Sequence, residues 1–160
     1  MADVSVTLRA IDEDNWMEVV LLTTSDEQVP RVLEEYVASN ALSICQALYE
    51  ETWIVKAVYC GIKVIGFAMY GYCTDRDEYQ ICRLMIDKKH QGKGLGSIAL
   101  SLCLDELFDM DECDAVYLQV HMDNERARHI YKRMGFSETG EMVGDELVMC
   151  LSAADRNRRY

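Results

Sequence analysis

The chain has few of the residues that mark disordered, membrane-bound or secreted proteins. Its 160 residues include one proline and nine glycines, too few for a linker-rich or low-complexity sequence. No apolar run approaches the roughly 20 residues that a membrane-spanning helix needs. The first residues are acidic, whereas a secretory signal peptide begins with basic ones. We therefore expect a cytoplasmic protein that does not associate with a membrane.

Metal-ligand and disulfide patterns are also missing. The seven cysteines form no Cys-x-x-Cys pair, and the three histidines are not spaced as ligands with cysteines or carboxylates. An odd number of unpaired cysteines argues against both a disulfide framework and a zinc ribbon. We expect reduced thiols and no bound metal.

Basic residues are scarce, with 16 Lys and Arg against 28 Asp and Glu and a formal net charge of −12. Proteins that bind nucleic-acid backbones usually carry a basic domain, so no nucleic-acid partner is expected. Residues 1–80 hold 14 acidic and 5 basic residues, and residues 81–160 hold 14 and 11. Most bases of the second half fall in two windows that suit a small phosphorylated ligand. These windows contain Arg83, Lys88, Lys89 and Lys93, and then Arg126, Arg128, Lys132 and Arg133.

Hydrophobic periodicity and turn residues divide the chain into strands and helices. The expected strands cover residues 4–9, 53–59, 63–70, 79–86, 115–120, 137–141 and 146–151. The expected helices cover residues 12–22, 30–37, 43–49, 94–107 and 124–134. This order predicts one domain over residues 1–154 with an α/β fold, followed by a flexible tail over residues 155–160.

A glycine-rich turn connects the strand that ends at Ile86 to the helix that begins near Gly94. The first amides of a helix lack intrahelical acceptors, and the helix dipole adds partial positive charge, so this position can bind an anion. Glycines at 92, 94 and 96 would let the backbone approach a phosphate. A tight connection without a ligand is the alternative. The spacing matches neither a P-loop nor a dinucleotide-binding fingerprint.

Two motifs together resemble the GNAT family of acetyl-CoA-dependent N-acetyltransferases. They are Gln91-x-x-Gly94-x-Gly96 and Asn124-x-x-Ala127-x-x-x-Tyr131-x-x-x-Gly135-Phe136. The resemblance covers nearly the whole chain and implies the acyl-CoA N-acyltransferase fold, a mixed, mostly antiparallel central sheet flanked by helices. It implies acetyl-CoA as cosubstrate and requires no metal. Many members of the family form homodimers, although no feature of this sequence decides the oligomeric state.

The resemblance assigns roles to the matching residues. Asn124 would hydrogen-bond the pantetheine arm of coenzyme A, and Tyr131 would donate a proton to the departing thiolate. The chemistry itself adds a further role: attack on the thioester builds an oxyanion, which amides near Met85 could stabilise where the two strands separate. The alternatives are helix capping for Asn124 and core packing for Tyr131.

The same resemblance assigns the rest of the cofactor site. The pantetheine amides would pair with the free edge of the strand that contains Leu84, Met85 and Ile86. Backbone amides of the turn would hold the pyrophosphate of coenzyme A. These amides belong to Gln91, Gly92, Lys93, Gly94, Leu95, Gly96 and Ser97.

Within the family, residues 66–71, residues 86–96 and the spacing of the N-terminal helices are similar to bacterial spermine/spermidine acetyltransferases. Carboxylates of the acid-rich half could attract such a polycation, and aromatic rings could face its ammonium groups. The candidates are Glu34, Glu35, Asp75, Asp77 and Glu78, with Tyr36, Tyr70 and Tyr72. A solvated surface is the alternative for each acid.

The proton acceptor is harder to assign. An alkylamine with a pKa near 10.4 is almost wholly protonated at pH 7, so a base must remove its proton. Such relatives often carry a carboxylate two positions before Leu84, where this chain has Cys82. We expect a water chain that ends at Glu78 or another acid. The rival hypothesis is a nucleophilic Cys82 that forms an acyl-enzyme, although no histidine lies near it in sequence.

The expected function is direct acetyl transfer from acetyl-CoA to a primary amine, a polyamine above all, within a ternary complex. Acetylation of a protein N-terminus or a lysine is a second hypothesis. A non-catalytic acyl-CoA-binding sensor is a third. Tyr131 favours an enzyme, because a protein that only binds the cofactor needs no acid there.

Overall fold

The computed structural model describes residues 5–24 and 39–158. Seven strands of this part form one sheet in the order β1-β2-β3-β4-β5-β7-β6. The strands are β1 (Val6–Ala10), β2 (Trp53–Cys60), β3 (Lys63–Cys73), β4 (Glu78–Ile86), β5 (Ala115–His121), β6 (Ser137–Val143) and β7 (Glu146–Ser152). The helices are α1 (Trp16–Val20), α2 (Asn40–Tyr49), α3 (Leu95–Phe108), α4 (Glu125–Met134) and α5 (Ala153–Asn157), with a 3-10 turn, η1, at Lys88–His90.

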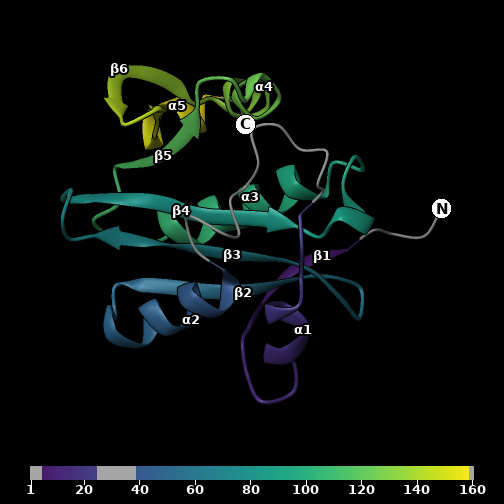
Figure 1. Cartoon of the computed structure of the whole chain (residues 1–160). Helices are drawn as coiled ribbons and strands as arrows, with labels where there is room; N and C mark the ends of the chain where they lie inside the picture. The colour runs from purple at the N-terminus through teal and green to yellow at the C-terminus, as the bar shows by residue number, and fades with distance from the viewer. Residues whose placement is uncertain (1–4, 25–38, 159–160) are drawn as a thin grey trace.

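Strands β1 to β4 form an antiparallel meander with helices on both faces (Figure 1). Side chains of β3 alternate between the faces: Ala68 and Tyr70 pack in the cluster with α3, and Phe67 and Met69 pack in the cluster with α1. All four are fully buried. A strand covered on both faces is apolar at nearly every position, which explains the continuous hydrophobic run in this part of the sequence.

The sheet opens between β4 and β5. These parallel strands pair at two positions, Tyr79 with Val116 and Gln80 with Tyr117, and beyond them β5 turns away from β4 (Figure 1). Cys82 is an extra residue in β4, because Tyr70 pairs with Ile81 and Met69 with Arg83. Such a bulge bends the strand that carries it. The bulge therefore lies where the two strands begin to separate.

The two helices predicted beside the opening are present. Gly94, with φ of 76°, precedes α3, whose buried face includes Leu95, Ala99 and Cys103. Helix α4 begins after Asn124, whose side chain accepts a hydrogen bond from the Ala127 N–H, and ends at Gly135, with φ of 104°. A left-handed residue that ends a helix is usually glycine, because a Cβ is disfavoured there.

The N-terminal helices differ in length from the prediction. Instead of one helix over residues 12–22, a turn precedes the five-residue α1. In this turn the Asp12 N–H donates to Asn15 Oδ1, and Asn15 Nδ2 donates to the Ala10 carbonyl. Local bonds of this type compete with helix formation. The helix expected from Pro30 lies outside the described residues.

Other predicted boundaries also move. Helix α2 begins at Asn40, three residues before the predicted start, because the Ser39 side chain caps it by accepting from the Leu42 N–H at 3.2 Å. The predicted flexible tail begins instead as a helix, since Asp155 to Asn157 belong to α5. Arg156 holds this helix to the end of α3 by donating to the Leu104 carbonyl at 2.6 Å. A cation near a helix C-terminus is favoured by the helix dipole.

Candidate active site

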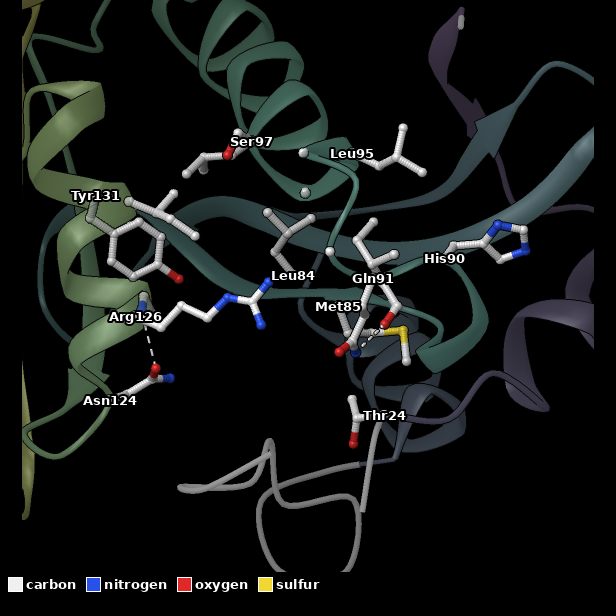
Figure 2. A pocket seen from close by; sticks show the side chains of 17 residues that line it. Thr24, Leu84, Met85, His90, Gln91, Leu95, Ser97, Asn124, Arg126 and Tyr131 are labelled. Atoms are coloured by element: carbon white, nitrogen blue, oxygen red, sulfur yellow. Dashed lines mark hydrogen bonds between the residues drawn. The ribbon is translucent and has the colours of Figure 1, made fainter. Parts of the chain in front are cut away.

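A cleft lies at the end of β4, between the starts of α3 and α4 (Figure 2). Four elements supply its walls: the end of β4, the glycine-rich turn, the first turns of α3, and α4. The lining residues are Thr24, Leu84, Met85, Ile86, His90, Gln91, Gly92, Gly94, Leu95, Gly96, Ser97, Leu100, Asn124, Arg126, Ala127, Ile130 and Tyr131. The cleft thus brings together residues of both sequence motifs.

The exposed backbone edge of β4 belongs to Leu84 and Ile86. The Asp87 N–H donates to the Ile65 carbonyl of β3 at 2.8 Å, and backbone groups of alternate residues face the same neighbouring strand. Met85 therefore also directs its N–H and C=O toward β3, and its side chain is buried beside α1. Leu84 and Ile86 direct theirs toward the opening, where Gln91 Nε2 donates to the Ile86 carbonyl at 2.8 Å.

The glycine-rich turn is shaped by two left-handed residues. Gly92 has φ of 77° and Gly94 has φ of 76°, and a Cβ built on either meets no atom within 4 Å. Glycine is required there by backbone conformation, and the turn leaves free space beside its backbone. Gly96 is different, because its Cβ would make an ordinary contact with Ile86 at 3.5 Å. Lys93 is exposed and is not among the cleft-lining residues.

Helix α4 presents Asn124 and Tyr131 to the cleft. Asn124 Oδ1 is used in capping, so the predicted cap is present, but the Nδ2 amide still has donors to offer. The Tyr131 ring lies against Phe136, with centroids 6.0 Å apart, and Figure 2 shows its hydroxyl pointing into the cleft. Burial raises the pKa of the Tyr131 hydroxyl and keeps it protonated at neutral pH. A proton donor needs this form.

Arg126 is a cleft residue that the sequence motifs did not identify. Figure 2 shows its guanidinium extending from α4 into the space between Tyr131 and Gln91. Arg126 belongs to one of the two basic windows, but its position is not part of the motif. The sequence did contain a signal for this position: Arg126 lies four residues before the apolar Ile130, and residues i and i+4 lie on the same face of a helix. His90 and Thr24 also line the cleft and were not predicted.

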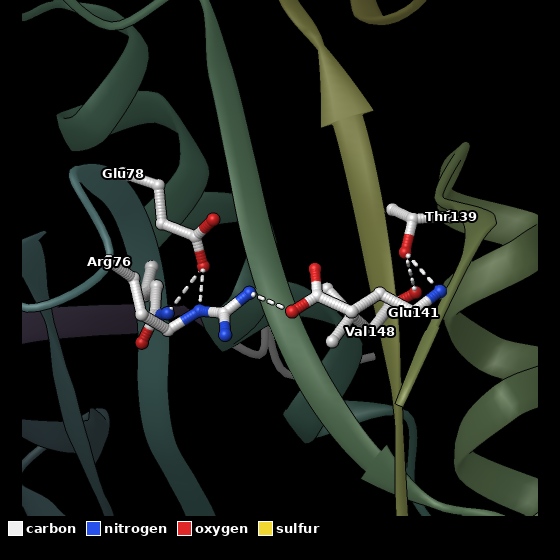
Figure 3. Close-up of polar contacts among 6 residues, drawn as sticks. Arg76, Glu78, Thr139, Glu141 and Val148 are labelled. Atoms are coloured by element: carbon white, nitrogen blue, oxygen red, sulfur yellow. Dashed lines mark hydrogen bonds and ion pairs between the residues drawn. The ribbon is translucent and has the colours of Figure 1, made fainter. Parts of the chain in front are cut away.

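The structure does not bring Glu78 into the cleft. Glu78 Oε1 accepts from Arg76 Nε at 2.7 Å and from Gln80 Nε2 at 2.6 Å, and Arg76 also contacts Glu141 Oε1 at 2.9 Å (Figure 3). Glu78 lies six residues before Leu84 along β4, which corresponds to about 20 Å. It forms part of an ion-pair cluster that links the β3–β4 turn to β6.

Cys82 lies at the bulge of β4, and its surroundings disfavour a nucleophile. Burial raises the pKa of the Cys82 thiol and outweighs the opposing effect of the nearby Arg83 charge. A thiol with a raised pKa is mostly uncharged at neutral pH, whereas the thiolate is the reactive form. The acyl-enzyme hypothesis gains no support from this environment.

The remaining substrate candidates divide into two groups. Glu34, Glu35 and Tyr36 lie outside the described residues. Tyr70 is fully buried and its hydroxyl donates to Glu106, so it faces no ligand. The Tyr72 hydroxyl donates to Asp77 at the end of the β3–β4 hairpin, away from the cleft-lining residues.

Among the described residues, no helix is long and apolar enough to cross a membrane. Within the same residues, no group of three His, Cys, Asp or Glu side chains could hold a metal ion.

Known proteins resemble this chain in sequence and in fold. The sequence profile of the acetyltransferase (GNAT) family matches residues 12–136. The spermine/spermidine N(1)-acetyltransferase of Bacillus subtilis (strain 168) is 28% identical over 144 residues, which cover 86% of this chain and 91% of that protein.

Two solved structures share the fold. The crystal structure of spermidine N-acetyltransferase from Vibrio cholerae in complex with CoA and spermine has a TM-score of 0.76 and 20% identity, and covers 95% of this chain and 98% of that one. Aminoglycoside acetyltransferase AAC(6')-Ib in complex with coenzyme A also has a TM-score of 0.76 and 20% identity, and covers 96% and 98%. Because the family profile matches most of the chain, from the turn before α1 to Phe136 at the end of the second motif, this protein belongs to the GNAT family of acetyltransferases.

Proposed function

We propose that this acetyltransferase transfers the acetyl group of acetyl-CoA to a primary amine, and that the amine is a polyamine. One observation carries the proposal: the open edge of β4, the glycine-rich turn before α3 and the Tyr131 hydroxyl meet in a single cleft. Acetyl-CoA supplies the activated acyl group as a thioester. The residues of this chain would bind the thioester, orient it and transfer the protons of the reaction.

The cleft fits a phosphorylated cofactor with an amide-bearing arm. Free space beside Gly92 and Gly94 would let backbone amides approach a phosphate, and Arg126 adds a positive charge. The backbone groups of Leu84 and Ile86 can pair with amides of the arm, as an edge strand pairs with an added strand. Asn124 Nδ2 is a further donor to the arm.

The catalytic roles follow from positions in the cleft. The Leu84 N–H faces the opening and would stabilise the negative charge that develops on the acyl oxygen. This refines the sequence-based assignment to Met85, whose backbone groups face β3. Tyr131 would donate its proton to the leaving sulfur, since its hydroxyl points into the cleft and stays protonated at neutral pH.

A polyamine acceptor is supported by two independent observations. The Bacillus subtilis relative is named for spermine and spermidine, and it aligns over most of both chains. The formal net charge of −12 favours a cationic substrate, because excess carboxylates raise the local concentration of cations. Glu34 and Glu35 remain candidates for this attraction.

A thiol-release assay tests the proposal. The protein would be incubated with acetyl-CoA and, in separate reactions, with spermidine, spermine, an aminoglycoside and a lysine-containing peptide. We expect thiol release with the two polyamines and an acetylated polyamine in the mass spectrum. Release with the peptide alone would favour a protein acetyltransferase. Binding of acetyl-CoA without release for any amine would favour a sensor.

A further inference from the structure

Asp87 is a buried carboxylate at the position directly after β4, and its side chain and backbone together are 8% exposed. Its N–H donates to the Ile65 carbonyl of β3 at 2.8 Å, so the residue is fixed to the sheet. Within the described part of the chain, Asp87 forms no ion pair. A buried charge is tolerated only when hydrogen-bond donors replace the water that it has lost. The donors that bind this carboxylate therefore indicate its role.

The two carboxylate oxygens of Asp87 bind two different segments. Oδ1 accepts from the Lys89 N–H at 3.0 Å, within the 3-10 turn η1 that leads to Gln91. Oδ2 accepts from the Thr23 N–H at 3.4 Å, in the chain just after α1. The backbone adds another link, because the Lys88 N–H donates to the Thr23 carbonyl at 2.9 Å. Asp87 thus joins the start of the glycine-rich turn to a segment that lies 64 residues earlier.

These two segments form different walls of the cleft. Gln91 lines it on the side of the turn, and Thr24, which is 7% exposed, lines it on the other side. Of the described residues that line the cleft, Thr24 alone precedes β4. Figure 2 shows Thr24 across the cleft from Ser97, with Met85 and Gln91 between them. Asp87 therefore connects the wall at Thr24 to the turn that would hold the cofactor.

The wall at Thr24 lies on the side from which an acceptor amine would reach the thioester. Tyr131 packs with the core on the α3 face of the sheet, whereas Met85 is buried on the α1 face. With the Tyr131 hydroxyl at the leaving sulfur, the amine has to approach the thioester carbon from the other face, because two groups cannot occupy one position. Met85 and Thr24 bound the cleft there.

We propose that Asp87 is a positioning residue that holds the acceptor wall at Thr24 in a fixed place relative to the cofactor turn. Its Oδ1 orders the turn, and its Oδ2 orders the wall past which the amine approaches. Direct transfer in a ternary complex requires both reactants to be held in a reactive geometry, and one rigid side chain would set their separation. This inference rests on the proposed amine acetyltransferase activity and adds a residue that positions the acceptor.

Asp87→Asn separates the two bonds. Asparagine keeps one accepting oxygen and replaces the other with an NH₂ donor. We expect the remaining oxygen to stay with the Lys89 N–H, because that bond is shorter and local, so the bond to the Thr23 N–H is lost. Asp87→Ala loses both bonds.

Asp12→Asn is a matched control. Asp12 Oδ1 also accepts from the N–H two residues farther along the chain, that of Asp14, at 3.0 Å. The substitution removes the same charge as Asp87→Asn, and Asp12 does not line the cleft. Any effect of lost negative charge on the attraction of a polycation therefore appears in both variants.

The expected result is a split between the two substrates. In Asp87→Asn, KM for spermidine should rise about tenfold, as for loss of one hydrogen bond to a charged group. The dissociation constant of acetyl-CoA, measured by calorimetry, should change less than about threefold. In Asp87→Ala both constants should rise, and in Asp12→Asn neither should. A residue that only stabilises the fold would not produce this split, because unfolding lowers the active fraction and leaves both constants unchanged.

Hydrogen–deuterium exchange tests the same positioning without activity. Amides of residues 19–24 should exchange faster in Asp87→Asn, and those of residues 88–97 should not. An unchanged spermidine KM in Asp87→Asn, or an equal rise in the acetyl-CoA dissociation constant, would overturn the inference. Absence of spermidine acetylation by the unaltered protein would instead contradict the proposed function. In that case unchanged exchange of residues 19–24 in Asp87→Asn would overturn the positioning role as well.

Discussion

Tyr131 shows how one residue combines packing and chemistry. Its ring belongs to the apolar face of α4 and contacts Phe136, as the core-packing hypothesis requires. Its hydroxyl points into the cleft, and no described residue accepts a hydrogen bond from it. Both predictions made for this residue are therefore compatible, because the phenol has an apolar body and a polar end.

Replacing this hydroxyl should affect chemistry more than binding. Tyr131→Phe keeps the ring and removes the proton donor, so kcat for spermidine should fall by about 100-fold or more, as for loss of a general acid. The dissociation constant of acetyl-CoA, measured by calorimetry, should change less than threefold. Tyr117→Phe is a matched control, because Tyr117 does not line the cleft. Equal turnover in Tyr131→Phe and the unaltered protein would remove Tyr131 from the mechanism.

The glycine-rich turn acts at the scale of an element, because its conformation sets the direction of the backbone amides before α3. Gly92 and Gly94 both have positive φ, and open space surrounds the position of each absent Cβ. Substitution there costs strain in the backbone and causes no clash. The turn can therefore be perturbed without disturbing the core.

Gly94→Ala tests the turn, with Gly140→Ala as its matched control. Gly140 has φ of 86° and also has open space around its Cβ position, but it lies in β6, away from the cleft. Each variant should lose about 1 to 2 kcal/mol of unfolding free energy, the usual cost of a left-handed non-glycine residue. Only Gly94→Ala should weaken acetyl-CoA binding in calorimetry, because it reorients the turn amides. Equal affinity in the two variants would contradict a role for the turn in binding.

The opening between β4 and β5 depends on the whole molecule. Strands β1 to β4 form one part of the sheet, and β5, β7 and β6 form the other. The two parts pair at two positions in β4 and β5, and the Arg76 cluster links them at the closed end (Figure 3). This arrangement leaves the ends of both strands apart, and the cleft lies between those ends.

Buried thiols in the core make the folded chain sensitive to alkali. Burial raises the pKa of Cys103 to about 12 and that of Cys113 to about 11, from an ordinary value of 9.0. Above pH 9 the unfolded chain loses these protons while the folded chain keeps them, so unfolding free energy must fall as pH rises. Below pH 9 both states are protonated and the effect vanishes.

Urea denaturation under reducing conditions measures this effect. The midpoint should decrease between pH 8 and pH 10.5, and the decrease should be smaller in Cys103→Ala, which removes the group with the higher pKa. Cys45→Ala serves as the control, because Cys45 is exposed. If Cys103→Ala and Cys45→Ala show the same pH dependence, burial of the Cys103 thiol does not contribute.

The sequence by itself determined the strands and helices of residues 53–152, the two motifs and the family. These features depend on local periodicity, on turn glycines and on capping residues, which neighbouring residues encode. The boundaries of α1 and α2 were less predictable, because Asn15 and Ser39 form side-chain bonds that change where a helix begins. The α5 helix was missed because Arg156 finds its partners on α3, about 50 residues away in the chain.

Only the tertiary structure decided which functional groups meet. It turned the Met85 backbone toward β3 and left Leu84 and Ile86 at the opening, because strand register sets which groups face a neighbour. It separated Glu78 from the cleft through its bonds to Arg76 and Gln80. It placed Arg126 in the cleft, at an opening that arises where β4 and β5 stop pairing. Long-range pairing and bulges create such neighbours, and a local pattern in one sequence does not record them.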